Sequence, residues 1–226
     1  MSSAPTRLPA AERRQALIDA AIRLFVAGSY RGTTTADIVK EAGVSEPILY
    51  RHFASKRELY LAAVEHVWCE VRTRWEEVVA TEPEPSLWPE RMSQSYVSLM
   101  STRFVLAELW VQALTEAGED PELRKYLRKH LREVHDFIAD FIRRSQEAGA
   151  VQRDRDADAE AWIFLAGGVL GTIGKRIGLL GDDDFRRIRE ARLEWLTGRK
   201  AARNERGDKR PGNEKGPRLR LRGPSS

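Results

Sequence analysis

The stretch Thr33–Leu59, TTTADIVKEAGVSEPILYRHFASKREL, decides the fold of this 226-residue chain. It predicts two short helices joined by a tight turn and followed at once by a third helix. Thr34 is a helix-capping residue, and Asp37 stands three positions later, where its carboxylate can accept from the N–H of Thr34. Gly43 ends the first helix, because only glycine enters the left-handed region there without cost. This is the pattern of a helix-turn-helix, whose second helix enters the major groove of DNA.

The second helix of the motif is predicted to have two different faces. Ser45 is its expected cap, and Pro47 is tolerated because its missing N–H falls among the unpaired groups of the first turn. Leu49 and Phe53 are four residues apart and are expected to face inward. The residues left facing outward are Glu46, Pro47, Tyr50 and Arg51.

The order T-x-x-D-I-x-x-x-A-G-V-S-x-x-x-L-Y-x-H-F-x-x-K-x-x-L resembles the DNA-binding part of the TetR family of bacterial regulators. The preceding LIDAAIRLFVAGSYRGTT resembles the family's first helix and its approach to the motif. The close resemblance covers residues 13–61, and beyond it only the architecture carries over. It implies an all-α chain with an N-terminal three-helix helix-turn-helix domain and a C-terminal helical domain for ligand binding and dimerisation.

The resemblance also implies roles for residues of the motif. In the family, the positions of Thr34, Tyr50, His52 and Lys56 meet the DNA backbone, and those of Glu46, Pro47, Ile48 and Arg51 lie near base edges. With two neighbouring hydroxyl residues, the predicted DNA-binding set is Thr34, Thr35, Ser45, Glu46, Pro47, Ile48, Tyr50, Arg51, His52 and Lys56. The alternative for Tyr50 and His52 is that they only pack against neighbouring helices.

Charge is distributed unevenly along the chain, whose formal net charge is +4. Residues 199–226 hold ten Lys and Arg against three acidic residues, and residues 1–60 hold nine against six, so the middle is acidic. Basic ends around an acidic middle suit a protein whose N-terminal part meets phosphates. The C-terminal stretch has few apolar residues and is predicted to be disordered, either as a solvating extension or as a nonspecific phosphate-binding arm.

Helical patterning continues after the motif, and no alternating strand pattern occurs in the sequence. The expected helices cover residues 10–27, the two segments of the motif, 55–80, one or two helices in 86–117, 121–149, 156–181 and 182–198. The expected organisation is a flexible N-terminus at 1–9, a DNA-binding domain at 10–56, a ligand-binding and dimerisation domain at 57–198, and a basic tail at 199–226.

Aromatic and methionine residues are frequent between residues 60 and 145. At helical spacing most such residues belong to a core, but they also form pockets for flat apolar molecules in helix bundles. In the family, the inducer pocket lies among these helices. The resemblance therefore favours a ligand-binding role for some of these aromatic and methionine residues. The predicted ligand-binding residues are Trp68, Arg72, Trp75, Tyr96, Met100, Phe104 and Trp110. Arg72 suits an anionic ligand, and the alternative is an ion pair with Glu76.

Four glycines in AWIFLAGGVLGTIGKRIGLL are spaced four, three and four residues apart, which places them on one helix face. Each glycine inside a helix costs about 1 kcal/mol relative to alanine, so close approach of another helix is the expected compensation. The partner is either a helix of the same chain or, by resemblance, a second subunit. The predicted dimer interface is Gly167, Gly171, Gly174, Gly178, Leu193, Trp195 and Leu196.

Several functional classes find no support in the sequence. There is no glycine-rich phosphate loop, no Gly-x-Ser-x-Gly and no H-E-x-x-H, so neither catalytic residues, a cofactor nor a metal site is predicted. The N-terminus does not read as a signal peptide, no apolar run reaches 18 residues, and Cys69 is the single cysteine, which together favour a cytoplasmic protein without a membrane segment.

The sequence predicts a regulator, most simply a repressor, that binds pseudo-palindromic operator DNA as a homodimer and is released by a small apolar or aromatic effector. The alternatives are an activator, a DNA-binding protein controlled by another protein, or a helical small-molecule carrier with a vestigial DNA-binding part. Sequence-selective DNA binding would separate the carrier from the others.

Overall fold

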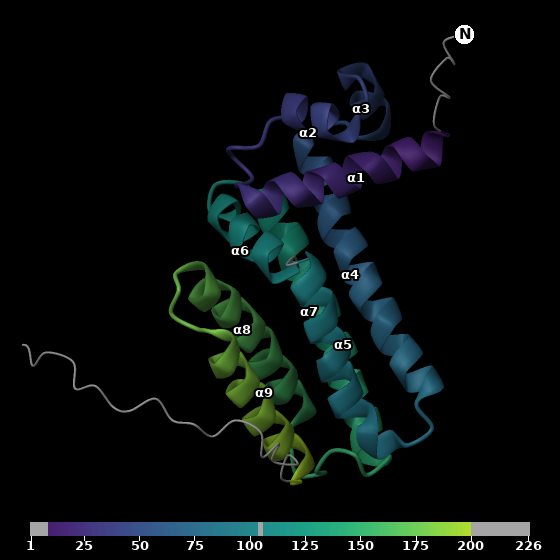
Figure 1. The fold of residues 1–226 in the computed structure, drawn as a ribbon, viewed down its shortest axis with the longest axis vertical. Helices are drawn as coiled ribbons and strands as arrows, with labels where there is room; N and C mark the ends of the chain where they lie inside the picture. The colour runs from purple at the N-terminus through teal and green to yellow at the C-terminus, as the bar shows by residue number, and fades with distance from the viewer. Residues whose placement is uncertain (1–8, 104–105, 200–226) are drawn as a thin grey trace, which may run out of the picture.

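The computed structural model describes the backbone of residues 9–103 and 106–199, and their side chains except at 96–103. Every regular element in these ranges is a helix, which confirms the predicted all-α fold. The elements are α1 (Ala10–Ala27), α2 (Thr35–Ala42), α3 (Glu46–His52), α4 (Lys56–Thr81), η1 (Pro85–Leu87), α5 (Trp88–Arg103), α6 (Leu106–Ala117), α7 (Pro121–Glu147), α8 (Ala157–Arg176) and α9 (Asp182–Thr197). Figure 1 shows α1, α2 and α3 grouped at one end of α4, with the later helices bundled beside α4. We call α1–α3 the head and α4–α9 the body.

Local signals place α2 and α3 where the sequence predicts them. Thr34 accepts from the N–H of Asp37, and the Asp37 carboxylate accepts from the N–H of Thr34 at 3.0 Å. These two bonds form the capping box. Gly43 ends α2 with φ 66°. Ser45 occupies the cap position of α3, although its side chain makes no capping hydrogen bond. Phe53, at the end of α3, belongs to the core that the head shares with α4.

The head is attached to the body through α4 and α6. The hydroxyl of Tyr60 on α4 donates to the carbonyl oxygen of Leu109 on α6. The side-chain amide of Gln112 on α6 donates to the carbonyl oxygen of Phe25 on α1 at 2.6 Å, and the Phe25 ring meets the Tyr60 ring edge-on at 5.0 Å. At the surface, Arg31 of the head forms ion pairs with two glutamates near the end of α6. Helix α6 is therefore in direct contact with the last turn of α1.

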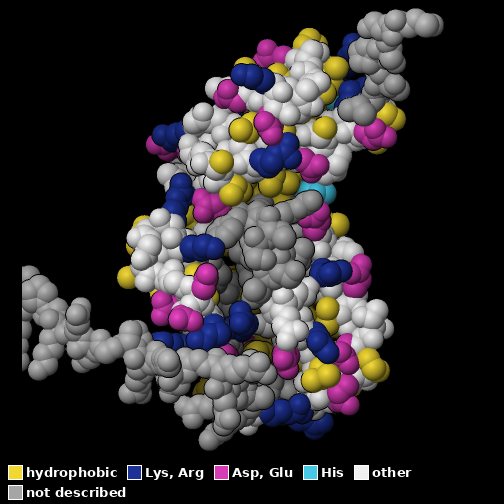
Figure 2. All heavy atoms as spheres, in the orientation of Figure 1, with side chains coloured by type: hydrophobic (Ala, Val, Ile, Leu, Met, Phe, Trp, Pro, Cys, Tyr) yellow, Lys and Arg dark blue, Asp and Glu magenta, His cyan; other side chains and the backbone are white. Residues whose placement is uncertain are grey.

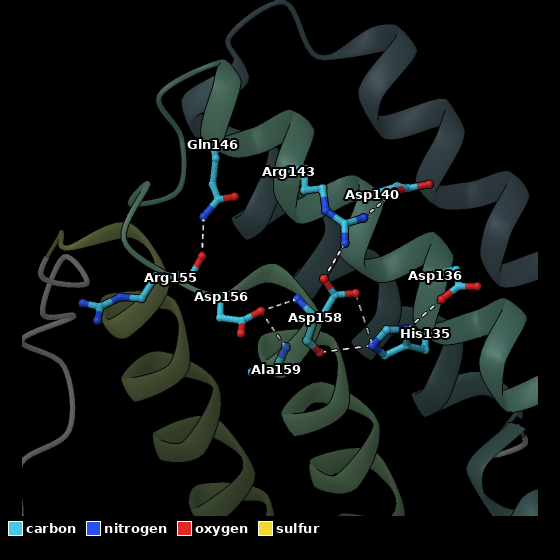
Figure 3. Close-up of polar contacts among 9 residues, drawn as sticks. All are labelled: His135, Asp136, Asp140, Arg143, Gln146, Arg155, Asp156, Asp158 and Ala159. Carbon is cyan, nitrogen blue, oxygen red and sulfur yellow. Dashed lines mark hydrogen bonds and ion pairs between the residues drawn. The ribbon is translucent and has the colours of Figure 1, made fainter.

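Polar contacts fix α7 to the first turn of α8 (Figure 3). The ring nitrogens of the buried His135 lie 2.8 Å from Oδ1 of Asp136 and 3.1 Å from the carbonyl oxygen of Asp158. The Arg143 guanidinium donates to Asp140 at 2.7 Å and to Asp158 at 2.5 Å. Charge-assisted bonds of this kind are stronger than neutral ones. Through the bonds to Asp158, these contacts join α7 to the first turn of α8.

The structure refines the sequence prediction in two places, the region 86–117 and the end of α8. The region 86–117 forms a short 3₁₀ turn and two separate helices, α5 and α6. Helix α8 ends at Arg176 rather than near residue 181, because Gly178 turns into the left-handed region with φ 68° and the N–H of Leu179 bonds to the carbonyl of Gly174. In the described ranges, no helix combines the length and the apolar character needed to cross a bilayer.

Candidate nucleic-acid interface and effector site

Helix α3 presents predicted DNA-binding residues on its outer face. Leu49 is completely buried, whereas the Tyr50 side chain beside it is 51% exposed. Glu46, Pro47 and Arg51 are also exposed. An exposed tyrosine next to an arginine offers hydrogen-bond donors of the kind that contact phosphate oxygens and base edges.

The first turns of α2 and α3 are linked by a side-chain hydrogen bond. The Thr35 hydroxyl donates to Oε1 of Glu46 at 3.2 Å. Thr34 is exposed, with its hydroxyl 2.6 Å from the Asp37 carboxylate, and Ser45 is exposed at the start of α3. The structure therefore brings four predicted DNA-binding residues onto one connected surface of the head. Their contact with DNA stays a prediction.

Three further predicted DNA-binding residues, Lys56, His52 and Ile48, are less exposed. The Lys56 ammonium donates to the carbonyl oxygens of Tyr30 at 2.8 Å and Thr33 at 3.1 Å, and burial lowers the pKa of Lys56. Lys56 therefore stabilises the connection between α1 and α2, and its contact with DNA stays a prediction. His52 is half-buried, and so is Ile48. On the face seen in Figure 2, basic, acidic and apolar side chains are intermixed over the head rather than gathered in one basic patch.

The body encloses a small apolar cavity of about 10 Å³, which has room for about one water molecule. Three predicted ligand-binding residues, Trp68, Trp75 and Trp110, line this cavity, and each is 4% exposed. The other lining residues come from α4, α6, α7 and α8; they are Val71, Leu106, Val134, Ile138, Phe164, Leu165 and Gly168. The tryptophans are thus core residues that also border an internal space.

The remaining predicted ligand-binding residues do not line this cavity or are not described. Arg72 is exposed and lies 3.6 Å from the Glu76 carboxylate, which is the alternative that the sequence left open. Tyr96 and Met100 belong to α5, but their side chains lie outside the described residues. Phe104 also lies outside the described residues.

His130 on α7 is a residue that sequence reasoning missed. It is 2% exposed, and neither ring nitrogen has a hydrogen-bond partner among the described residues. Nε1 of Trp110 likewise has none, and the two rings meet at 5.9 Å. Burial lowers the pKa of His130 to about 4, so the ring is neutral near pH 7. The available signal was its position on the apolar stripe of α7, between Leu127 and Val134.

The predicted glycine face of α8 meets different surroundings along its length. A side chain at Gly171 would meet the Phe185 ring at 2.8 Å, and one at Gly174 would meet the Leu180 side chain at 2.6 Å. These two glycines therefore allow close packing within the chain. A side chain at Gly167 would meet nothing within 4 Å.

The other predicted dimer residues lie at the end of α8 and on α9. Gly178 is exposed beyond the last residue of α8, Leu193 and Leu196 are half-buried, and Trp195 is 51% exposed. Large apolar side chains are nevertheless exposed along both helices and the turn between them; they are Trp162, Ile163, Leu170, Ile173, Ile177, Leu179, Ile188 and Trp195. Sequence reasoning named only the last of these.

Metal-ligating side chains do not gather in the described part of the chain. No group of three or more His, Cys, Asp or Glu residues is placed there to hold a metal ion. Cys69 is exposed on α4.

The head and body together define a helix-turn-helix protein of the DNA-binding class. Residues 17–63 match the sequence profile of the bacterial regulatory proteins of the tetR family, and residues 90–167 match the C-terminal profile of BetI-type transcriptional repressors. The chain belongs to the TetR family of bacterial transcriptional regulators.

Individual relatives agree with this assignment. The HTH-type transcriptional activator FasR of Mycolicibacterium smegmatis is 49% identical over 59 residues, which cover 26% of this chain and 27% of FasR. The HTH-type transcriptional regulator UidR of Escherichia coli is 25% identical over 152 residues, covering 67% of this chain and 76% of UidR. The crystal structure of a TetR-family regulator from Agrobacterium tumefaciens superimposes with a TM-score of 0.70 at 21% identity, over 84% of this chain and 100% of that one. The structural likeness supports the fold.

Proposed function

We propose that this protein is a homodimeric regulator, most simply a repressor, that binds pseudo-palindromic operator DNA and is released by a small apolar or aromatic effector. The observation that carries the proposal is the pairing of an exposed α3 face with an apolar cavity bordered by α6, the helix that touches the head. A carrier with a vestigial head would have no use for a connection between these two sites. Tyr50 at 51% exposure is the clearest sign of a face made for a partner.

In the proposed complex, α3 lies in the major groove. Glu46 accepts from a cytosine amino group, Pro47 or Ile48 touches a thymine methyl, and Tyr50 contacts the backbone. Each good bidentate base contact contributes about 1–3 kcal/mol of discrimination. The predicted backbone contacts of Thr34, His52 and Lys56 flank α3.

Two copies of the chain are proposed to associate through α8 and α9. The exposed apolar side chains there, from Trp162 to Trp195, form the kind of surface that monomeric proteins rarely leave uncovered. A two-fold dimer places its recognition helices on half-sites about 34–36 Å apart, or at a multiple of that spacing. Because the interface is isologous, the operator should be pseudo-palindromic.

Release is proposed to pass from the cavity to the head through α6 and α4. Leu106 and Trp110 of α6 border the cavity, and Gln112 of the same helix bonds to Phe25 in the head. An effector that enlarges the cavity therefore displaces a helix on which the head rests, and α4 follows through Tyr60. If the effector binds the DNA-incompetent state ~100-fold more tightly, it supplies about 2.7 kcal/mol of coupling.

The test is operator binding by a variant that changes only the α3 face. We expect Tyr50→Ala with Arg51→Ala to weaken operator binding by about 10- to 100-fold, since two groups at the interface are lost. The matched control is Arg128→Ala, an exposed arginine on α7. Lys56 is left intact because its bonds to Tyr30 and Thr33 would confuse folding with binding. Unchanged operator affinity of a folded double variant would contradict the assignment.

A further inference from the structure

A second hollow lies outside the cavity, between α4 and α7. It has a volume of about 220 Å³, far larger than the 10 Å³ of the inner cavity. Its lining residues are Trp75, Glu76 and Val79 of α4 and Phe137, Asp140, Phe141 and Arg144 of α7. We call this hollow the outer cleft. Of these seven residues, only Trp75 was predicted from the sequence to bind a ligand.

The outer cleft and the inner cavity share one wall. The Trp75 indole stacks on the Phe137 ring with 6.0 Å between centroids and 20° between planes, and it meets the Phe164 ring edge-on at 5.7 Å. Trp75 lines both spaces, whereas Phe137 lines only the outer cleft and Phe164 only the inner cavity. An apolar body resting in the outer cleft therefore lies against the same indole that closes the inner cavity. Aromatic surfaces of this size favour flat or extended apolar molecules.

The charged residues of the outer cleft are not equally available. Asp140 accepts from Arg143 at 2.7 Å, and Glu76 lies 3.6 Å from Arg72. The Arg144 side chain makes neither a hydrogen bond nor an ion pair within the described ranges. A cation entering the cleft would compete with existing ion pairs, while an anion would meet a guanidinium whose donors are uncommitted. Arginine binds carboxylates and similar groups with two parallel hydrogen bonds.

We propose that the outer cleft is a binding site for an amphipathic organic anion, whose carboxylate or comparable head is held by Arg144 and whose apolar body lies on Trp75, Phe137 and Phe141. The proposal rests on the proposed function and specifies its effector as an apolar or aromatic body that also carries an anionic head. The head group stays at the solvent side of the cleft, and the body points toward the inner cavity.

The experiment compares two fluorescent probes that share one aromatic body. 8-Anilinonaphthalene-1-sulfonate carries an anionic head, and N-phenyl-1-naphthylamine lacks it. Each is titrated into the full-length protein at physiological salt. We expect Arg144→Gln to weaken binding of the sulfonate at least about tenfold, because a charge-assisted pair is lost, and to leave binding of the neutral probe within about twofold. The control Arg128→Gln makes the same change of charge on an exposed part of α7 outside the cleft, and both affinities should stay unchanged.

Two results would overturn the proposal. One is equal affinity of the sulfonate for the wild-type protein and Arg144→Gln. The other is equal loss of both probes in Arg144→Gln, which would assign Arg144 a structural role; thermal melting of the variant identifies that case. Failure of the proposed function gives a different result. The sulfonate then binds in an Arg144-dependent manner, but operator affinity is the same with and without the bound sulfonate. Conversely, release of DNA by both probes without any Arg144 dependence would retain the regulator and remove the anion site.

Discussion

The head and the body use their buried residues in opposite ways. In the head, Leu49 and Phe53 are at most 1% exposed, and predicted DNA-binding side chains such as Tyr50 lie on the outer side of this filled core. In the body, buried aromatic residues surround empty space, and the ring nitrogens of His130 lack partners among the described residues. Buried polar groups are normally hydrogen-bonded, so an exception asks for an explanation. The predicted DNA-binding surface therefore stands on a filled core, whereas the candidate effector site borders a cavity within the core.

The largest expected difference between the two regions is in stability. Leu49→Ala should lower the free energy of unfolding by about 2–5 kcal/mol, because a fully buried side chain leaves a cavity in a filled core. Leu106→Ala removes the same atoms beside an existing cavity, so fewer contacts are lost and the cost should be smaller. Urea denaturation of both variants measures the difference. Equal costs would mean that the body is packed as completely as the head.

The next effect is a dependence of stability on pH that arises from His130, a residue of the body. The pKa of His130 is about 4 in the folded protein and about 6.5 when unfolded, so the unfolded state binds the extra proton first as the pH falls. Stability should therefore be retained above pH 6.5 and decline by roughly 3 kcal/mol between pH 6.5 and 4, because burial outweighs the attraction of Glu133. Nδ1 also lies 3.6 Å from the Glu65 carboxylate, and the Tyr126 ring stacks on the imidazole at 5.5 Å.

His130→Phe removes the titrating group while keeping a ring of similar shape against Tyr126. The stability of this variant should depend less on pH in the same window, by the amount that His130 contributes. Urea midpoints at pH 7 and pH 4.5 for the wild-type protein and the variant provide the measurement. Identical pH dependence in the two proteins would show that His130 is not the source.

The smallest effect concerns the link between the two regions. Gln112→Leu should cost about 1 kcal/mol of stability, because the bond from its amide to the Phe25 carbonyl is lost. Gln94→Leu is the matched control, since Gln94 is exposed on α5 and, among the described residues, bonds to the exposed side chains of Glu90 and Arg91. Thermal denaturation of both variants decides the point. If Gln94→Leu lowers stability as much as Gln112→Leu, the hydrogen bond from Gln112 to Phe25 makes no specific contribution to stability.

The head could be predicted from sequence because its signals are local. The start and the end of α2 are set by three residues of the same short segment, Thr34, Asp37 and Gly43. The four-residue spacing of Leu49 and Phe53 is enough to predict the inward face of α3. The role of Lys56 shows the limit of such reasoning. Its place at a helix start predicted a phosphate contact, but only the tertiary fold brings the carbonyls of residues 30 and 33 to its ammonium.

The body was harder to predict because its candidate site joins segments that are distant in the sequence. The three tryptophans of the cavity were predicted because they are large aromatic residues. Phe164 and Arg144 were not predicted, because the sequence does not show which faces of α8 and α7 turn toward the other helices. The glycines of α8 show the same difficulty. Spacing put them on one face, but whether Phe185 of the same chain or a second subunit covers that face depends on the path of α9. Their part in a dimer interface stays a prediction.

Operator reading by α3 can be tested by binding of the full-length protein to DNA from its own upstream region, with unrelated competitor DNA at physiological salt. We predict sequence-selective binding by two protomers, with protection of two half-sites separated by about one helical turn or a multiple of it. Binding that is weak, indifferent to sequence and abolished by modest salt would reflect phosphate attraction alone. That result would contradict the account of the α3 face as an operator-reading surface.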